Sequence, residues 1–422
     1  MRGADTHKAI ETVWRLESPR LIGALVRVVR DLDLAEELAQ DALVAALERW
    51  PVDGVPDNPG AWLMTAARHR GIDQLRRRKL IERKHAVLGA DPDGEAFAMP
   101  DLDALDDDIG DDLLRLIFAA CHPALSPEAQ VALTLRLLGG LSTAEIARAF
   151  LQSEPTVAQR IVRAKRTLAE KGVAFEVPRG EERAARLPAV LGTLYLIFNE
   201  GYAATAGEDL LRPALCEEAL RLARTLAALM PREAEAQGLL ALLELQASRQ
   251  RARTDADGRP VLLPEQNRAL WDRLAIRRGL DALARAERLG GALGPYALQA
   301  AIAACHARAR RYGDTDWPRI AALYALLARV APSPVVELNR AVAVAVAEGP
   351  AAGLAVVEAL RGEPALAHYH LLPAVRGDLL DKLGRHAEAG AEFERAAALA
   401  GNARERQLML ERAARCRPGA AG

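Results

Sequence analysis

The sequence is poor in aromatic residues, which make up 4% of its 422 residues, and it contains four cysteines. The cysteines lie far apart and form no CxxC pair, which argues against a disulfide framework and against a zinc site. They are Cys121, Cys216, Cys305 and Cys416. No run of about 18 uninterrupted apolar residues occurs, and the N-terminus lacks an apolar leader, so we expect a cytoplasmic protein without membrane contact.

Signatures of catalysis are also missing. No phosphate-binding loop, nucleophile elbow or cluster of metal ligands is visible. The eight histidines are scattered, and His368 and His370, two residues apart, would not share a helix face. We therefore expect no enzyme, no metal and no cofactor.

Alanine and leucine dominate a chain that is half hydrophobic, which favours packed helices over sheets. The length indicates two to three domains. The net charge is −1, but residues 91–112 carry ten acids and no Lys or Arg. We predict an all-α fold with two small helical domains (8–84 and 112–172), an acidic linker between them (85–111), and a helical-repeat domain (180–416).

The N-terminal domain should contain an amphipathic helix pair over residues 8–30 and a clear helix over residues 33–50. Asp33 is a plausible N-cap for this second helix. Its apolar side includes Leu34, Leu38 and Trp50. Its polar side carries Glu36, Glu37, Gln40, Asp41 and Glu48. That side is either a solvated face or a surface that binds a basic partner.

The stretch AWLMTAARHRGIDQLRRRK (61–79) begins as a buried helix and ends in positive charge. Asn58 is a good N-cap and Pro59 suits the first helical position. The cations are Arg68, Arg70, Arg76, Arg77, Arg78 and Lys79, with Asp73 as the acid among them. Four consecutive cations point in all directions around a helix. In isolation this stretch is a solvated helix end, and the rest of the chain favours a function for it.

Residues 142–168 have the pattern of a helix-turn-helix. Ser142 and Glu145 predict a capping box, and Ser153 can cap a second helix that tolerates Pro155 in its first turn. One side of that helix is apolar, while the other carries Thr156, Gln159, Arg160, Arg163 and Arg166. Such a face offers donors to base edges and phosphates. The alternative is an ordinary helical hairpin with a solvated face.

Residues 180–416 are almost wholly helical by pattern. LLDKLGRHAEAG followed by AEFERAAALAGN is typical of a tetratricopeptide-like unit, with Gly384 between its helices. The scattered aromatic residues of this half are more often packing residues than parts of a ligand site.

The order of these parts resembles the extracytoplasmic-function (ECF) sigma factors of bacterial RNA polymerase. LAEELAQDALVAALERW is similar to their core-polymerase-binding helix. NPGAWLMTAARHRGIDQLRRRK is similar to their −10 segment, and LSTAEIARAFLQSEPTVAQRIVRAKRTL to their −35 helix-turn-helix. Pro155 departs from the family, which usually has Gly there. YLIFNEGY, GPYALQAAIAACHA, TDWPRIAALY and SPVVELNRAVAVA resemble the subgroup with a long tetratricopeptide-like extension.

The resemblance implies a sigma factor that initiates transcription, with core RNA polymerase and promoter DNA as partners. The polar side of the 33–50 helix would bind the polymerase. The −10 residues would be Asp57, Asn58, Trp62, Asp73 and the six cations of 68–79. The −35 residues would be Ser153, Thr156, Gln159, Arg160, Arg163 and Arg166. Genes for small DGPF-motif (YCII-related) proteins commonly neighbour this subgroup, so the resemblance implies such a protein or another ligand of the regulatory extension.

Two other interpretations remain open at this point. A helix-turn-helix regulator with a solenoid sensor would explain residues 142–168 and 180–416 but leave residues 33–84 without a role. A scaffold of helical repeats would make every basic stretch a solvated surface. Binding to core polymerase separates the first from a sigma factor, and sequence preference in a holoenzyme footprint separates the second.

Overall fold

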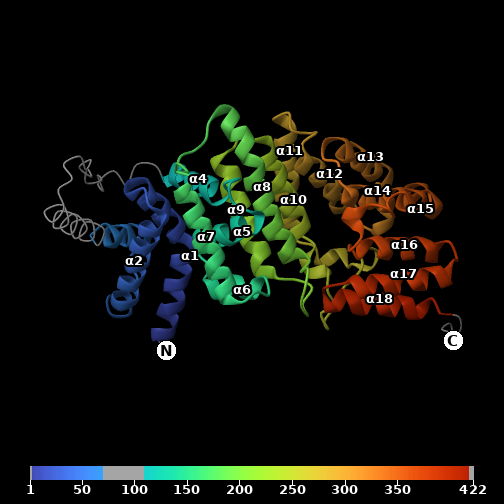
Figure 1. Cartoon of the computed structure of the whole chain (residues 1–422), viewed down its shortest axis with the longest axis horizontal. Coiled ribbons are helices and arrows are strands. Elements are labelled where there is room, and N and C mark those ends of the chain that lie inside the picture. Colours follow the sequence, from blue (N-terminus) through green and yellow to red (C-terminus); the bar gives the residue numbers. More distant parts are fainter. Residues whose placement is uncertain (1, 70–108, 418–422) are drawn as a thin grey trace. The chain divides into compact units, whose positions relative to one another are not determined.

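The structure, a computed structural model, describes residues 2–69 and 109–417. These residues form helices joined by short connections, and the described ranges contain isolated β-bridges but no strand, which confirms the all-α prediction. The chain divides into two compact units, residues 1–193 and 194–422 (Figure 1). Most of the predicted linker, residues 85–108, lies outside the described residues.

The first unit begins with a single long helix, α1 (Arg2–Val29), followed by α2 (Leu32–Asp53). The prediction of a helix pair over residues 8–30 was therefore wrong. Pro19 lies inside α1, where it removes one backbone donor without ending the helix. Leu21, Ile22 and Leu25 are buried on this helix.

The start of α2 also differs from the prediction, because Asp31 and not Asp33 is the N-cap. The Asp31 carboxylate accepts a hydrogen bond from the backbone N–H of Leu34 at 3.0 Å. Arg30 has φ 52°, a left-handed conformation that turns the chain between α1 and α2. This turn brings Asp31, rather than Asp33, to the first exposed N–H groups of the helix.

The apolar side predicted for α2 is buried. Leu34, Leu38 and Trp50 are at most 3% exposed, and α2 packs along α1. A further helical stretch covers residues 59–69. Asn58 caps it as predicted, since its side chain accepts the backbone N–H of Ala61 at 3.1 Å.

Four short helices form the second part of the first unit: α4 (Ile109–Ala120), α5 (Pro127–Leu137), α6 (Thr143–Ala149) and α7 (Glu154–Glu170). The capping box of Ser142 and Glu145 is present at α6, and Ser153 caps α7 with Pro155 in its first turn. Leu151, with φ 50°, makes the turn between α6 and α7. The predicted helix-turn-helix is therefore present.

Helix α8 (Gly180–Tyr202) begins in the first unit. Arg186, which is buried, donates to the carbonyl oxygen of Phe118 at 3.0 Å. Thr193 donates to the side-chain oxygen of Gln130 at 3.1 Å. Residues up to Thr193 thus pack on α4 and α5, although residue 180 was the predicted start of the extension.

The second unit is a succession of helices in which each packs against the next (Figure 1). They are α9 (Pro213–Leu229), α10 (Ala234–Ala247), α11 (Arg273–Arg288), α12 (Pro295–Arg308), α13 (Trp317–Val330), α14 (Pro334–Glu348), α15 (Pro350–Ala359), α16 (Leu371–Lys382), α17 (His386–Leu399) and α18 (Ala403–Arg415). Short 3₁₀ turns connect some of them: Gln250–Ala252, Leu263–Glu265, Arg268–Leu270, Tyr312–Asp314 and Pro364–Leu366.

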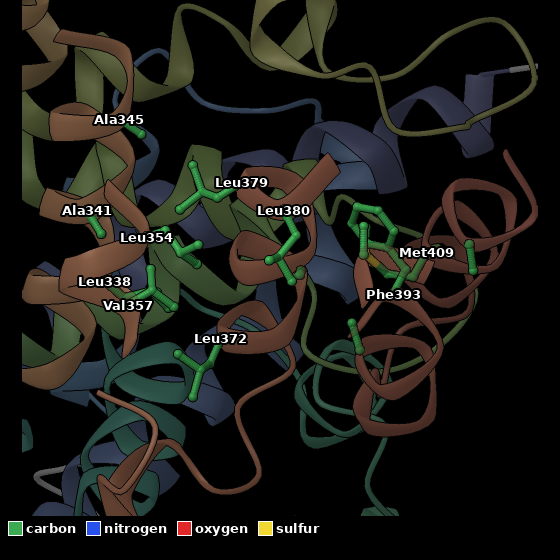
Figure 2. Packing of buried hydrophobic residues seen from close by; sticks show 14 of the residues in the cluster. Leu338, Ala341, Ala345, Leu354, Val357, Leu372, Leu379, Leu380, Phe393 and Met409 are labelled. Atoms are coloured by element: carbon green, nitrogen blue, oxygen red, sulfur yellow. The ribbon is translucent and has the colours of Figure 1, made fainter. Parts of the chain in front are cut away.

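The last helices of this unit share one hydrophobic core, shown in Figure 2. Phe393 of α17 is fully buried, and a Cβ added at Gly377 of α16 would lie 2.9 Å from its ring. Glycine is therefore needed where α16 crosses α17. Gly384, with φ 76°, turns the chain between the two helices as the sequence predicted.

The capping box of α6 gives a stability prediction with a defined pH dependence. Burial alone would raise the pKa of Glu145, but hydrogen bonds from Ser142 and the charge of Arg15 hold the pKa below its ordinary value of 4.5. A lowered folded-state pKa stabilises the fold above the unfolded value, and this stabilisation is lost as the pH falls through the folded value. Glu145→Ala should therefore lower the free energy of unfolding by about 1 kcal/mol at pH 7, with a smaller loss below pH 4.5.

Urea unfolding followed by circular dichroism measures this difference. Glu154→Ala is the matched control, since Glu154 lies exposed in the first turn of α7. Its effect should stay within about 0.5 kcal/mol. If Glu145→Ala lowered the free energy of unfolding equally at pH 7 and pH 3, the result would contradict a stabilising role for the charged Glu145 carboxylate.

Candidate nucleic-acid and polymerase interface

Helix α7 presents one polar face to solvent. Val157, Ile161 and Leu168 bury the opposite side, so the remaining positions must face outward. Ser153, Thr156, Gln159, Arg163 and Arg166 are exposed, and Arg160 is half-buried. The structure therefore brings the six predicted −35 residues together on one helix.

Two of these arginines are held in place by neighbouring side chains. Arg160 donates from Nη1 to the side-chain oxygen of Gln152 at 2.7 Å. Arg166 donates to Glu170 one turn later at 2.6 Å, and this hydrogen bond raises the pKa of Arg166. Such an exposed pair orients the guanidinium and contributes little to stability.

A groove of about 360 Å³ runs beside this face. Thr156, Gln159 and Arg163 line one wall, and the turn with Ser126 and Ala129 at the start of α5 lines the other. Ser126 caps α5 through the backbone N–H of Ala129. Backbone N–H groups at a helix start and arginines on a facing helix are suitable contacts for phosphates.

The polar side of α2 is divided between solvent and protein. Glu37, Gln40 and Glu48 are exposed, and Asp41 is half-buried. Glu36 is buried instead, with 6% of the residue exposed. Its carboxylate pairs with Arg136 Nε at 2.7 Å and with Lys165 Nζ at 2.6 Å.

The described part of the basic stretch is anchored by two tryptophans. Trp62 makes an edge-to-face contact with Trp50, with ring centroids 5.3 Å apart. Asp57 and Asn58 are exposed, and Arg68 is half-buried at the end of the described helix. The other predicted −10 residues, Arg70, Asp73, Arg76, Arg77, Arg78 and Lys79, lie outside the described residues.

Arg136 and Lys165 had no role in the sequence interpretation. Lys165 lies in the recognition helix among arginines that face solvent, while its own side chain is 13% exposed. Glu36 and Lys165 are 129 positions apart, so no local periodicity connects them. The opposite charges of Glu36 and Lys165 are compatible with an ion pair, but so are those of many other residue pairs in a chain with 27% charged residues.

Residues 2–69 and 109–417 contain neither a metal site nor a membrane-spanning helix. No group of three or more His, Cys, Asp or Glu in these ranges has a geometry that would hold a metal ion. All four cysteines are free and buried, and burial raises the pKa of Cys121 to about 11. Among the described helices, none combines the length and apolar character needed to cross a bilayer.

Three known families match successive parts of the chain. Residues 13–81 match sigma-70 region 2, and residues 115–168 match sigma-70 region 4. Residues 186–287 match DUF6596, a family of unknown function. Region 2 thus covers most of α1, α2 and the basic stretch, and region 4 covers the helix-turn-helix. No solved structure matches the chain.

Three relatives are similar to parts or most of the chain. Uncharacterized protein R00370 of Rhizobium meliloti (strain 1021) is 49% identical over 389 residues, which cover 92% of this chain and 91% of that protein. Probable ECF RNA polymerase sigma factor SigI of Mycobacterium tuberculosis (strain CDC 1551 / Oshkosh) is 27% identical over 42% of this chain and 60% of its own length. ECF RNA polymerase sigma factor SigK of Mycobacterium ulcerans (strain Agy99) is 28% identical over 35% of this chain and 78% of its own length.

Region 2 precedes region 4 in the chain, and the similarity to the Rhizobium relative extends beyond both regions to 92% of the chain. Sigma factors are transcription initiation factors rather than enzymes. The chain belongs to the ECF sigma factors, within the subgroup that carries a long helical C-terminal extension.

Proposed function

We propose that this protein directs bacterial RNA polymerase to specific promoters, with α7 reading the −35 element. The single observation that carries the proposal is the outward face of α7. This helix is the second of the helix-turn-helix, it is capped, and it exposes Thr156, Gln159 and Arg163 together. Arginine and glutamine form bidentate hydrogen bonds with guanine and adenine edges in the major groove. Ser153 and Arg166, at the two ends of the face, are placed to contact phosphates that fix the register.

The basic stretch after Asn58 is proposed to hold the −10 region. Each phosphate neutralised by a cation of residues 68–79 would release counterions and steepen the dependence of binding on salt. Residues 51–58 were expected to be a loop that holds an unstacked non-template base; residues 51–53 end α2 instead, and residues 54–58 form the loop that would hold the base. Unstacking a base costs a few kcal/mol, which contacts such as Asp57, Asn58 and Trp62 would have to offset.

The polymerase is proposed to bind the polar side of α2. Glu37, Gln40 and Glu48 form an exposed acidic strip there, with Asp41 beside them and Glu36 at its buried edge. A basic coiled coil of the polymerase large subunit would complement this charge, and complementary charge speeds association and fixes the register. The protein would therefore act in the cytoplasm with core polymerase and promoter DNA as its partners.

The extension is proposed to regulate these activities, on the basis of its size and its succession of packed helices. Helical repeats provide extended surfaces for partners. A DGPF-motif protein or another ligand of the extension would supply the signal.

Arg163 gives a direct test of the −35 contact. Arg163→Ala should weaken binding of the holoenzyme to its promoter by about 1–3 kcal/mol, because it removes an exposed donor in the middle of the face. Competition binding with promoter fragments that carry a mutated −35 element measures this loss of affinity. Arg395→Ala, which removes an exposed arginine of α17, is the control and should leave affinity unchanged. Equal affinity of the Arg163→Ala and unsubstituted proteins would sink the assignment.

Run-off transcription tests the regulatory role of the extension. A chain ending after residue 193 keeps Arg186 and Thr193, which pack on α4 and α5, and it corresponds to the first compact unit. Its transcript yield with core polymerase should differ from that of the full chain by about fivefold or more, the usual lower range for coupling between sites. Circular dichroism checks that the shortened chain is folded. The same yield from both chains would contradict regulation by the extension.

A further inference from the structure

One carboxylate on the proposed polymerase-binding side of α2 already has protein partners. Glu36 pairs with Arg136 of α5 and with Lys165 of α7, at 2.7 Å and 2.6 Å. Only 8% of its side chain is exposed, against 25% for Arg136 and 13% for Lys165. Both cations belong to region 4, whereas Glu36 belongs to region 2. We call these three residues the Glu36 cluster.

The cluster lies within a wider contact between the two regions. Lys165 also pairs with Asp33 at 2.8 Å, and Arg15 of α1 pairs with Glu145 at 2.6 Å. The backbones approach closely beside it, since a Cβ added at Gly140 would lie 3.3 Å from the Cα of Arg15. Region 4 is thus seated against the start of α2 and the middle of α1.

These ion pairs contribute unequally to the free energy of the contact. Asp33 is 74% exposed and Arg15 45% exposed, and exposed pairs contribute little. Glu36 is buried, so loss of its partners would leave an uncompensated charge away from water. Burial alone would lower the pKa of Lys165, but the charges of Glu36 and Asp33 raise it, so the lysine is charged in this contact. The Glu36 cluster is therefore a buried electrostatic constraint on the contact, alongside Asp112 of α4, which is 1% exposed and pairs with Arg27 of α1 at 3.3 Å.

The surroundings of the cluster allow the contact to open. A groove of about 460 Å³ separates α1 and α2 from α5 and α6, and Glu36, Gln40 and Arg136 line it. Val44, which also lines the groove, remains 45% exposed. Apolar side chains such as Trp14 and Leu43 line the groove together with these polar ones, so the two regions are not closely packed at this point. A contact with such a groove buries less apolar surface than a close-packed one and loses less on opening.

We propose that the Glu36 cluster is an internal latch, in which region 4 occupies part of the α2 surface that core polymerase needs. This inference rests on the proposed function of α2. Arg136 and Lys165 would then be released when the polymerase supplies cations of its own to Glu36. When only a fraction of the protein molecules is in the binding-competent form, the apparent dissociation constant equals that of the competent form divided by this fraction. An open fraction of about one tenth would make the apparent dissociation constant about tenfold larger than that of the open form.

The test uses the full chain with Arg136→Ala and Lys165→Ala combined. Neither residue belongs to the proposed polymerase-binding or −35 sets, so their loss opens the latch without removing a proposed contact. Resonance energy transfer between dyes on Val52→Cys and Lys171→Cys, both exposed positions, reports the separation of α2 and α7 without polymerase. The native thiols are buried and label slowly. The double substitution should change the transfer efficiency and tighten binding to core polymerase by about threefold to tenfold.

Arg20→Ala is the control variant. It removes an exposed ion pair of α1, with Glu17, at a distance of 3.7 Å, and should change neither readout. Unchanged transfer efficiency in the double variant, with its helicity intact, would overturn the latch and leave the proposed function untouched. A changed efficiency with unchanged polymerase affinity would overturn the competition. If neither the variant nor the unsubstituted chain binds polymerase, the proposed function fails together with the competition, whatever the transfer efficiency shows.

Discussion

A buried carboxylate has to be paired, and in the first unit this constraint falls on Glu36 and on Asp112, which pairs with Arg27 of α1 at 3.3 Å. The Glu36 side chain is 8% exposed and lies between the cations of Arg136 and Lys165. The remaining acidic residues of the same side of α2 are exposed or half-buried. One helix therefore carries acidic residues in two environments, one buried between cations of the protein and one nearer to solvent. The way in which α2 meets α5 and α7 depends on how the Glu36 carboxylate is satisfied.

The same division between a buried and an open side explains the recognition helix. Val157, Ile161 and Leu168 fix α7 against α5 and α6, so Thr156 and Arg163 are presented on a rigid element. A capped start matters because the first backbone N–H groups of a helix need partners, and Ser153 supplies one through Thr156. Lys165 turns away from the reading face toward α2. Helix α7 thus contributes to two surfaces: Arg163 belongs to the proposed DNA-reading face, and Lys165, two positions later, belongs to the contact with α2.

Local patterns predicted most of the helices and both caps of the helix-turn-helix. The capping box of Ser142 and the apolar side of α7 follow from spacing alone, and the structure confirms both. Predictions were wrong where another feature of the chain overrode the local sequence signal. The helix pair predicted over residues 8–30 is part of the single helix α1, which continues through Pro19, and Asp31 occupies the capping position expected for Asp33 because Arg30 turns the chain first.

Tertiary pairing was beyond the reach of sequence patterns. Glu36 shares the periodicity of Glu37 and Gln40, and nothing local distinguishes the buried carboxylate from the exposed residues. Only the meeting of α2 with α5 and α7 does so. Similarly, Gly180 seemed to begin the extension, whereas Arg186 and Thr193 pack into the first unit.

The most direct measurement for the account is transcription from a defined template by core RNA polymerase with and without this protein. The account predicts that adding the protein produces a transcript from one start site, and that mutation of the −35 or −10 element abolishes it. A protein that forms no complex with core polymerase, or a complex that transcribes every template equally, would contradict promoter recognition by α7 and the basic stretch.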